Sequence, residues 1–555
     1  MKYLIPVLAV LSAAPLAAQG TMRDPSQLDM GLGTAKYPAI ASSGNTATAI
    51  WLEDVTNNLW SNSSADGGAT WGPAVRIDDD ATGASKYCYD TNLASSGSSV
   101  YYAWRDQRGG GGVEDVFFTA SHDGGATWSA NVRIDDLNAP GTVDTDALKV
   151  AASGNNVYVL MRINRTGGEG LWLASSHDGG VTWNPTIAVD ADLGDVDLEG
   201  ISAEGADVHI AWCDNRNSSD DDLFYTMSHN GGLSFMGTEV QLDASGASNG
   251  DIDYSEIWVC SEGGLVAVSW MEDELPTSMT DEELHVVVSS DGGHNWGAET
   301  TLLTGADADG HFMSLGNDGT DSLIAVTWED NRSGADEIYV AVSSDEGATW
   351  TENQLSTTGG SYPVVRCNSV HIGVTWAGDG FPENPYLATS LDGGLTFTAG
   401  DMAKGTQIGD ADYVELAMNP DGNFHGIWLS DDSGSNVCWA GGMELAGPGH
   451  PTYTITGLVA GGNATLMVTG CANTSNVLFA YSLNGAGPTA TPYGSVDMSM
   501  PITRLPVVPC DATGTASLLV AIPSGAAGLS VWLQAAEMQV SGAIVLTNAL
   551  AETIL

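Results

Sequence analysis

Positive charge is scarce in this sequence. Lys and Arg together account for 16 of the 555 residues, against 70 Asp and Glu, so the formal net charge is −54 at pH 7. A surface of this sign repels phosphate backbones and anionic membranes, which excludes nucleic acid as an expected partner. Two interpretations of the acidity stay open: a solubilising surface suited to salty surroundings, and carboxylate clusters that bind Ca²⁺.

Long hydrophobic runs are also missing beyond the first 20 residues. No later segment reaches the ~20 apolar residues that a membrane helix needs, so we expect no membrane span. The N-terminus, MKYLIPVLAVLSAAPLAAQG, combines Lys2, an apolar run to Leu11 and small residues to Ala18. This pattern is typical of a secretory signal peptide, here residues 1–18. We therefore expect an exported protein, extracellular or periplasmic.

Cysteines are few and none has CxxC spacing, which argues against a zinc site. The seven cysteines lie at 88, 213, 260, 367, 438, 471 and 510. Export permits disulfides. Cys471 and Cys510 are the pair that shares a small region, so they are the predicted disulfide.

Amphipathic helical periodicity is absent as well. The sequence instead contains a repeated motif of eight residues, the octet. SHDGGATW at 121–128 has six near-copies elsewhere in the chain, so the motif occurs seven times. Their acidic positions are 47 to 61 residues apart: Asp66, Asp123, Asp178, Asn230, Asp291, Asp345 and Asp392. Gly-Gly supplies positive φ for a tight hairpin, and the carboxylate can accept hydrogen bonds from the backbone of the turn. The octet acids are therefore predicted to be structural.

Each octet belongs to a larger unit of four short β runs. An alternating run that ends in Trp and an acid precedes the octet, as in VYYAWRDQR at 100–108, and a run such as NVRIDD at 131–136 follows it. Period-two alternation with turn residues about every dozen positions predicts strands, so the fold class is all-β. A unit of this length is the span of a four-stranded propeller blade.

The octets resemble the Asp-box of the sialidase (BNR-repeat) superfamily, Ser-x-Asp-x-Gly-x-Thr-Trp, over residues 21–445. The resemblance implies a β-propeller whose octets lie on the face away from the ligand. An eighth unit without an octet ends at residue 445, and PSQLDMG at 25–31 resembles the fourth runs of other units. We expect the N-terminus to supply the missing strand and to close eight blades, with seven as the alternative.

Residues 446–555 have a different composition. A Gly/Pro linker, AGPGHPT, leads into β runs with almost no charge, and Arg504 is their one basic residue. We expect a separate C-terminal β-sandwich domain.

Arginines are the candidate ligand-binding residues of the propeller. Strand direction alternates within a blade, so the residues after each Trp run gather on the face opposite the octets. Arg108, Arg216 and Arg332 repeat in Trp-x-Asp-x-Arg elements, as ion pairs that brace neighbouring blades or as ligand contacts. Other arginines break the pattern, and guanidinium groups suit a carboxylate or sulfate. These are Arg105, Arg162, Arg165 and Arg366.

The resemblance also implies a catalytic apparatus. Sialidases hold the sugar carboxylate with three arginines and use a Tyr–Glu nucleophile pair with an Asp acid/base. Tyr254 with Glu256, and Tyr413 with Glu415, have the required residue types, although each tyrosine also fits a packing position at the start of a first run. The family's N-terminal Arg-Ile-Pro element is absent.

The acidic segments between units provide the calcium candidates, Asp195, Asp197, Asp251 and Asp253, with solvated loops as the alternative. No cofactor is required, and calcium is an optional one. The sequence thus predicts a secreted propeller that acts on or binds an extracellular glycan or glycoconjugate, as an exo-glycosidase of sialidase type. The alternative is a non-catalytic, calcium-dependent scaffold that binds a glycan or a protein.

Overall fold

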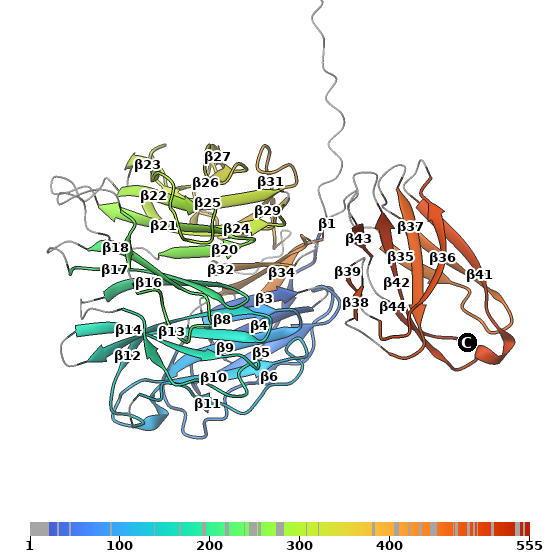
Figure 1. Ribbon diagram of the computed structural model, residues 1–555, viewed down its shortest axis with the longest axis horizontal. Coiled ribbons are helices and arrows are strands. Elements are labelled where there is room, and N and C mark those ends of the chain that lie inside the picture. Colours follow the sequence, from blue (N-terminus) through green and yellow to red (C-terminus); the bar gives the residue numbers. More distant parts are fainter. Residues whose placement is uncertain are drawn as a thin grey trace, which may run out of the picture. The chain divides into compact units, whose positions relative to one another are not determined.

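The computed structural model describes residues 21–555 with gaps (Figure 1). The gaps are 30, 32, 44–45, 89–91, 138, 166–167, 191–195, 217–220, 238, 244–251, 253–256, 274–281, 307, 320, 380–382, 404–409, 420–421, 432–435, 445–451, 470, 472–474, 486–488, 492–493, 497, 512–514, 539–543 and 548–549. The chain divides into two compact units, Met22–Glu444 and a second that contains Leu445–Leu555. No described helix is long and apolar enough to cross a membrane.

Eight antiparallel sheets account for the described strands of Met22–Glu444, and we number them along the chain. Sheet 1 contains β3 (Ala35–Ser43), β4 (Thr46–Glu53), β5 (Asn58–Ser64) and β6 (Val75–Arg76). Sheet 2 contains β7 (Lys86–Tyr87), β8 (Leu93–Ser96), β9 (Ser99–Asp106), β10 (Asp115–Ser121) and β11 (Val132–Arg133). Sheet 3 contains β12 (Thr145–Ser153), β13 (Asn156–Arg165), β14 (Gly168–Ser176) and β15 (Ile187–Ala188), and sheet 4 contains β16 (Val196–Glu204), β17 (Asp207–Asp214), β18 (Asp222–Ser228) and β19 (Val240–Gln241). The short 3₁₀ helix η2 (Gln107–Gly109) follows β9.

Sheets 5 to 8 continue the same order. Sheet 5 contains β20 (Trp258–Glu262), β21 (Leu265–Asp273), β22 (Glu282–Ser289) and β23 (Thr300–Ala306), and sheet 6 contains β24 (Ala308–Asn317), β25 (Ser322–Asp330), β26 (Glu337–Ser343) and β27 (Thr351–Gln354). Sheet 7 contains β28 (Ser361–Cys367), β29 (Ile372–Ala377), β30 (Pro385–Ser390) and β31 (Thr398–Asp401). Sheet 8 contains β32 (Ala411–Met418), β33 (Phe424–Ser430) and β34 (Val437–Glu444) together with the N-terminal strands β1 (Thr21–Met22) and β2 (Ser26–Gln27).

The first strands of successive sheets contact one another. The contacts run from β3 through β8, β12, β16, β20, β24 and β28 to β32, and β32 contacts β3 again. In sheet 8, β2 pairs with β34, with Ser26 opposite Ala440 and Gln27 opposite Trp439. The N-terminal segment and the last strands of this unit therefore share one sheet, and the series of first strands has no free end.

The second strands of the sheets are largely buried. Every residue of β29 and β33 is buried, and in β4 and β17 the first residue alone is partly exposed. These strands pack on both faces, so apolar residues interrupt the alternation that an exposed sheet would show. Six second-strand tryptophans are at most 1% exposed: Trp51, Trp104, Trp212, Trp270, Trp328 and Trp428.

Each octet forms a turn that its own side chains hold together. In SHDGGATW, Asp123 Oδ1 accepts from Ser121 Oγ at 2.8 Å and from the Thr127 amide at 2.8 Å, and Asp123 Oδ2 accepts from Thr127 Oγ1 at 2.6 Å. The same network recurs in the other six octets, with Asn230 and Asn295 making equivalent bonds. The Gly124 amide also donates to the Ser98 carbonyl in the turn between β8 and β9. Octets and the turns between first and second strands thus share one face, the octet face.

The octet also fastens its sheet to the preceding one. Trp183 lies edge-on to Phe118 of the preceding sheet, with ring centroids 4.9 Å apart, and Trp128 Nε1 donates to Ser61 Oγ at 3.0 Å. The second glycine has positive φ, and a Cβ at Gly180 would collide with Phe118. The octet aromatic residue therefore braces neighbouring sheets.

The octet of sheet 1 packs against sheet 8. A Cβ at Gly68 would lie 3.0 Å from both Arg23 Nη1 and His425 Nδ1, and His425 belongs to β33. Burial lowers the pKa of His425 to about 3, so the neighbouring Arg23 guanidinium faces a neutral ring. Sheet 8 has no octet among its described residues, and the sheet 1 octet supplies this joint.

The C-terminal unit contains two antiparallel sheets around one apolar core (Figure 1). One sheet comprises β35 (Thr452–Thr456), β36 (Asn463–Thr469) and β41 (Thr515–Ala521); the other comprises β40 (Thr503–Pro509), β37 (Asn476–Ser482), β42 (Ser530–Met538), β43 (Ile544–Leu546) and β44 (Leu550–Thr553). A hairpin of β38 (Thr489–Thr491) and β39 (Gly494–Val496) and the 3₁₀ helix η3 (Ser524–Ala526) complete it. Tyr453, Val468 and Phe479 are fully buried between the sheets.

Candidate functional site

The Trp-x-Asp-x-Arg elements lie on the face opposite the octets, which we call the mouth face. Asp106, Asp214 and Asp330 at the ends of second strands are at most 1% exposed. In sheet 4, Asp214 Oδ2 accepts from Trp212 Nε1 at 2.8 Å, and Asp214 Oδ1 accepts from Arg216 Nε at 2.8 Å. The Arg216 guanidinium lies 4.2 Å from the Phe224 ring centroid. Burial lowers the pKa of Arg216, but the hydrogen bonds to Asp214 and Glu239 outweigh it and raise that pKa.

The outer partners of these arginines differ from the predicted brace between blades. Arg108 Nη1 lies 2.6 Å from Asp79 Oδ1, which follows β6 of the preceding sheet. Arg216 pairs with Glu239, and Arg332 Nη1 lies 3.1 Å from Glu352 Oε1, both within the same sheet. One of the three elements therefore joins neighbouring sheets, and two stabilise their own. All three guanidinium groups are engaged by carboxylates of the protein.

Arg105 and Arg162 occupy equivalent positions, one residue after the buried second-strand residues Trp104 and Met161. Arg105 Nη1 lies 2.7 Å from Glu114 Oε2 and donates to the Thr145 carbonyl of the next sheet at 3.0 Å. Arg162 Nε lies 3.2 Å from Glu169 Oε2, and Arg162 Nη1 donates to the Val196 carbonyl of the next sheet at 3.1 Å. These two arginines connect adjacent sheets.

Arg366 is placed differently, because it lines a pocket formed by the first strands. The cavity measures about 240 Å³, and β8, β12, β16, β20, β24 and β28 contribute to its lining. Lys149 Nζ lies 5.8 Å from the Trp258 ring centroid, and the Arg366 guanidinium lies 4.5 Å from the Phe312 centroid. The Trp258 and Phe312 rings touch, with centroids 3.6 Å apart. We call this the first-strand pocket.

The first-strand pocket is cationic in a strongly anionic protein. Its described lining contains Lys149 and Arg366 but no Asp or Glu. No described carboxylate lies within ion-pairing distance of Arg366, whose Nη1 donates to its neighbour's carbonyl, Val365 O, at 2.9 Å. Burial raises the pKa of the Cys260 thiol to about 12, so this lining residue stays neutral beside Arg366. Two cations over aromatic faces suit a small anionic group on an apolar or sugar ring.

Three tyrosines share an unusual backbone conformation where first strands begin on the mouth face. Tyr37, Tyr362 and Tyr413 have φ of 51°, 55° and 50°, and each lies at a register shift in its first strand. Tyr362 is 65% exposed and Tyr413 is 51% exposed, with ring centroids 6.2 Å apart and planes 17° from parallel. The Tyr362 amide donates to Glu329 Oε2 of the preceding sheet at 3.1 Å. We call these three residues the tyrosine rim.

Backbone strain of this kind persists where the surrounding structure enforces it, commonly at functional sites. In these strands the register shift at each tyrosine is the feature that enforces the conformation. The rim thus offers flat apolar surfaces next to solvent, while Glu415, the predicted partner of Tyr413, is partly buried in β32.

Carboxylates of sheets 7 and 8 interact with one another, and one of them, Asp412, directly precedes Tyr413. Burial and then Asp410 and Asp412 raise the pKa of Glu383, and burial with Asp431 and Asp410 raises the pKa of Asp412. This part of the mouth face therefore takes up protons more readily than isolated carboxylates do.

Several predicted residues lie outside the described part of the chain. They are Tyr254, Glu256, Asp195, Asp251 and Asp253, as is the predicted signal peptide. Arg165 and Asp197 fall in β13 and β16, but their side chains are not described. Cys471 and Cys510 are free thiols here, and their sulfur atoms and a carboxylate oxygen of Glu537 lie within 4.8 Å of one another.

Sequence reasoning missed Lys149, Trp258 and Phe312 because it searched the connections between strands. These residues sit inside first strands, whose side chains were assigned to packing. One signal was present: Lys149 is a lone lysine in an otherwise apolar run, ALKVAAS at 147–153.

No family model matches this chain, and no curated protein matches it at the sequence level. Solved structures of glycan-active enzymes do resemble it. An ulvan lyase of polysaccharide lyase family PL25 has a TM-score of 0.41 and 9% identity, and the likeness covers 69% of this chain and 96% of the lyase. An α-L-arabinofuranosidase from Fusarium graminearum has a TM-score of 0.32 and 12% identity, covering 52% and 89% of the two chains. A sialidase from Trypanosoma rangeli has a TM-score of 0.32 and 12% identity, covering 74% and 85%.

Proposed function

We propose that residues 21–445 form an eight-bladed Asp-box propeller, exported from the cell, that binds an extracellular glycan carrying an anionic group. The observation that carries this proposal is the first-strand pocket, where Lys149 and Arg366 lie over the Trp258 and Phe312 rings. The chain has 16 basic residues, and ion pairs with the protein's own carboxylates occupy most of the described arginines.

The eight-bladed form is supported by the order of the sheets. Each sheet is a meander, first strands contact in sequence, and β32 returns to β3. The pairing of β2 with β34 and the joint between Gly68 and His425 both connect sheet 1 and the N-terminus to sheet 8. A closed ring removes the exposed sheet edge on which other chains could pair. Residues 446–555 would form a β-sandwich domain, which fits their two sheets and shared core.

The binding mode follows from the two parts of the site. A carboxylate or sulfate placed in the first-strand pocket gains charge-assisted hydrogen bonds from Arg366 and Lys149. The tyrosine rim provides flat, half-apolar surfaces against which sugar rings can stack. Together they favour a saccharide over a small inorganic anion.

Hydrolysis of sialidase type is the second candidate, and one observation favours it. Tyr413 is exposed on the mouth face with Glu415 two residues further along β32, which are the residue types of the Tyr–Glu nucleophile pair. The described lining of the first-strand pocket offers no carboxylate for acid/base work. We therefore place binding first and hydrolysis second.

The test is a binding titration with the full-length protein. Sialylated, uronate-containing and sulfated oligosaccharides are compared with neutral ones by calorimetry, with and without a calcium chelator, and a fluorogenic sialoside is assayed in parallel. We expect saturable binding of an acidic class, weakened roughly 10- to 100-fold by Arg366→Gln or Lys149→Gln, because a hydrogen bond to a charged group is worth about 1.5–3 kcal/mol.

The matched control is Arg332→Gln, which removes the same charge on the mouth face outside the first-strand pocket. Equal weakening by this variant would mean that the general field of the protein, and not the pocket, governs binding. Preference for neutral sugars would overturn the proposal. Hydrolysis of the sialoside that is lost when Tyr413 is replaced would instead support the second candidate, sialidase-type hydrolysis.

A further inference from the structure

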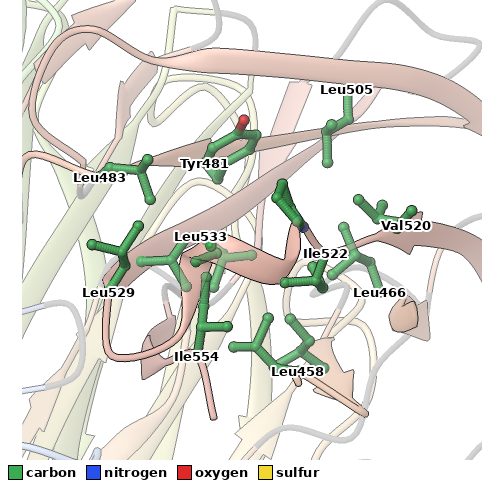
Figure 2. A pocket seen from close by; sticks show the side chains of 16 residues that line it. Leu458, Leu466, Tyr481, Leu483, Leu505, Val520, Ile522, Leu529, Leu533 and Ile554 are labelled. Atoms are coloured by element: carbon green, nitrogen blue, oxygen red, sulfur yellow. The ribbon is translucent and has the colours of Figure 1, made fainter. Parts of the chain in front are cut away.

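A cavity of about 310 Å³ opens within the C-terminal unit (Figure 2). Ile455, Leu466 and Val520 line it from the three-stranded sheet, and Tyr481, Leu505 and Leu533 line it from the opposite sheet. Figure 2 shows Leu466, Val520, Tyr481, Leu505 and Leu533 around the space, with Leu458 and Ile554 below it. The cavity therefore lies between the two sheets, where a sandwich normally closes its core.

The lining is apolar almost throughout. Every one of its 16 residues is aliphatic, aromatic, Pro, Ala or Gly, and the Tyr481 hydroxyl is their one polar side-chain group. Ordered water in a cavity needs two to four polar partners, so this space does not suit water. An empty space of this size costs stability in proportion to its volume, because the lining loses packing contacts.

Two leucines of the lining reach solvent. Leu483 and Leu529 are 49% and 46% exposed, and they lie together on one side of the space in Figure 2. Val459 and Leu555, each next to a lining residue, are 47% and 77% exposed. The entrance is thus apolar as well, in a segment whose one basic residue is Arg504 and whose acids are four in number.

We propose that this cavity binds a single unbranched aliphatic chain of a free amphiphile, whose polar head remains in solvent at Leu483 and Leu529. The depth between two sheets admits a slender molecule and excludes the folded surface of a protein partner. A purely apolar lining offers nothing to a sugar hydroxyl or an anion, so the ligand class differs from that proposed for the first-strand pocket.

The volume of the cavity limits the length of the aliphatic chain that it can hold. An apolar cavity of about 150 Å³ takes up benzene, with its six carbons. At 310 Å³ the present cavity has about twice that volume, so about twelve carbons fit. The affinity of 1-alkanols should then rise about fourfold per methylene, as expected for burial of CH₂ groups, and level off near dodecanol.

The experiment uses the full-length protein and N-phenyl-1-naphthylamine, a neutral probe that fluoresces in apolar surroundings. We expect saturable binding at one site and displacement by 1-alkanols with the chain-length ceiling just described. Ala526→Phe and Leu458→Trp place extra atoms in the cavity and should each weaken probe binding at least tenfold. Thermal unfolding of both variants verifies that they fold, since filling a void does not remove core contacts.

Leu519→Gln is the matched control, because Leu519 is 65% exposed on β41 and is not among the lining residues. It should leave probe binding unchanged. Absence of saturable binding, retention of full affinity in both filled variants, or affinity that keeps rising beyond hexadecanol would overturn the proposal. Binding of the protein to phosphatidylcholine vesicles, without displacement of the bound probe by monomeric alkanols, would overturn it too, since a bilayer surface would then be the ligand.

Discussion

The two units of this chain keep their folds together with different chemistry. Residues 22–444 carry 66 of the 70 acidic residues, and many are used inside the structure, in the octets and in the Trp-x-Asp-x-Arg elements. Residues 445–555 carry the other four and rely on packing between two sheets. A unit built of repeats must join each sheet to the next, and directional polar contacts do this repeatedly. A unit with one core needs no such joints.

Loss of a buried carboxylate is the largest expected effect. Asp214→Ala leaves the Trp212 indole N–H and the Arg216 guanidinium without their shared partner. Breaking a buried pair of this kind costs about 3–5 kcal/mol. We expect calorimetry to show that the transition of residues 22–444 moves down in temperature while that of the C-terminal unit does not.

Asp54→Ala is the control for this variant. Lys36 and Asp54 form an ion pair of 2.8 Å on the mouth face, but both side chains are more than 40% exposed. An exposed pair contributes about 0–1 kcal/mol, so the transition should hardly move. Equal effects of the two variants, or a joint shift of both transitions, would contradict the division drawn here.

Oxidation of the C-terminal thiols is expected to come next. Cys471 and Cys510 lie close enough to react, and export exposes them to oxidants. Reaction with glutathione disulfide would join the two sulfur atoms and release two molecules of glutathione. Closing a loop of this length typically stabilises by about 2–4 kcal/mol. The C-terminal transition should rise, with a mass loss of two hydrogen atoms.

The thiols of the larger unit supply the comparison. Cys88 and Cys438 are completely buried, so glutathione disulfide does not reach their sulfur atoms, whereas Cys510 is partly exposed and can begin the exchange. Mass spectrometry after alkylation should find these cysteines reduced under the same treatment. A metal ion retained by Cys471, Cys510 and Glu537 in the reduced protein would contradict the disulfide.

The octets show how far sequence alone could predict this fold. A motif of eight residues fixes its own turn through Ser, Asp and Thr, so local chemistry was enough to locate every hairpin between third and fourth strands. The contact of Trp183 with Phe118 was beyond reach, because it joins residues 65 positions apart in different sheets. Repetition shows that units stack, but not which side chains meet.

The candidate site was harder to predict for the same reason. Arg366 was singled out from sequence, yet its neighbours Lys149, Trp258 and Phe312 come from three other sheets. Arg105 and Arg162 were grouped with it because they share a residue type, and the structure engages them between neighbouring sheets. Residue type indicated which arginines to consider, whereas their location depends on how the first strands converge.

A smaller effect should come from a single octet carboxylate. Asp123→Ala removes three hydrogen bonds from a turn that is already partly exposed to water. Capping interactions of this kind are worth about 1 kcal/mol. Denaturant titration should show a modest loss confined to residues 22–444. A loss as large as that of Asp214→Ala would mean that the octets carry the joints between sheets through their carboxylates and not through their aromatic residues.

The smallest effect concerns the one octet that has Asn in place of the acid. Asn230 accepts from the Ser234 amide at 3.0 Å and donates through Nδ2 to Ser234 Oγ at 2.8 Å. In Asn230→Asp the Ser234 hydroxyl would turn to donate, as Thr182 does to Asp178. We expect a gain of about 0.5 kcal/mol, at the upper end for a surface position.

The pH dependence of this gain tests its cause. Hydrogen bonds from Thr182 lower the pKa of Asp178 to about 2, below the value of about 3.9 for an unfolded aspartate. A group with a depressed folded-state pKa stabilises above the unfolded value and loses that contribution as pH falls toward the folded one. The advantage of Asn230→Asp over the wild type should therefore be complete above pH 4 and vanish near pH 2. Because Asn does not titrate, a gain that persists at pH 2 would show that the new side chain acts through packing and not through its charge.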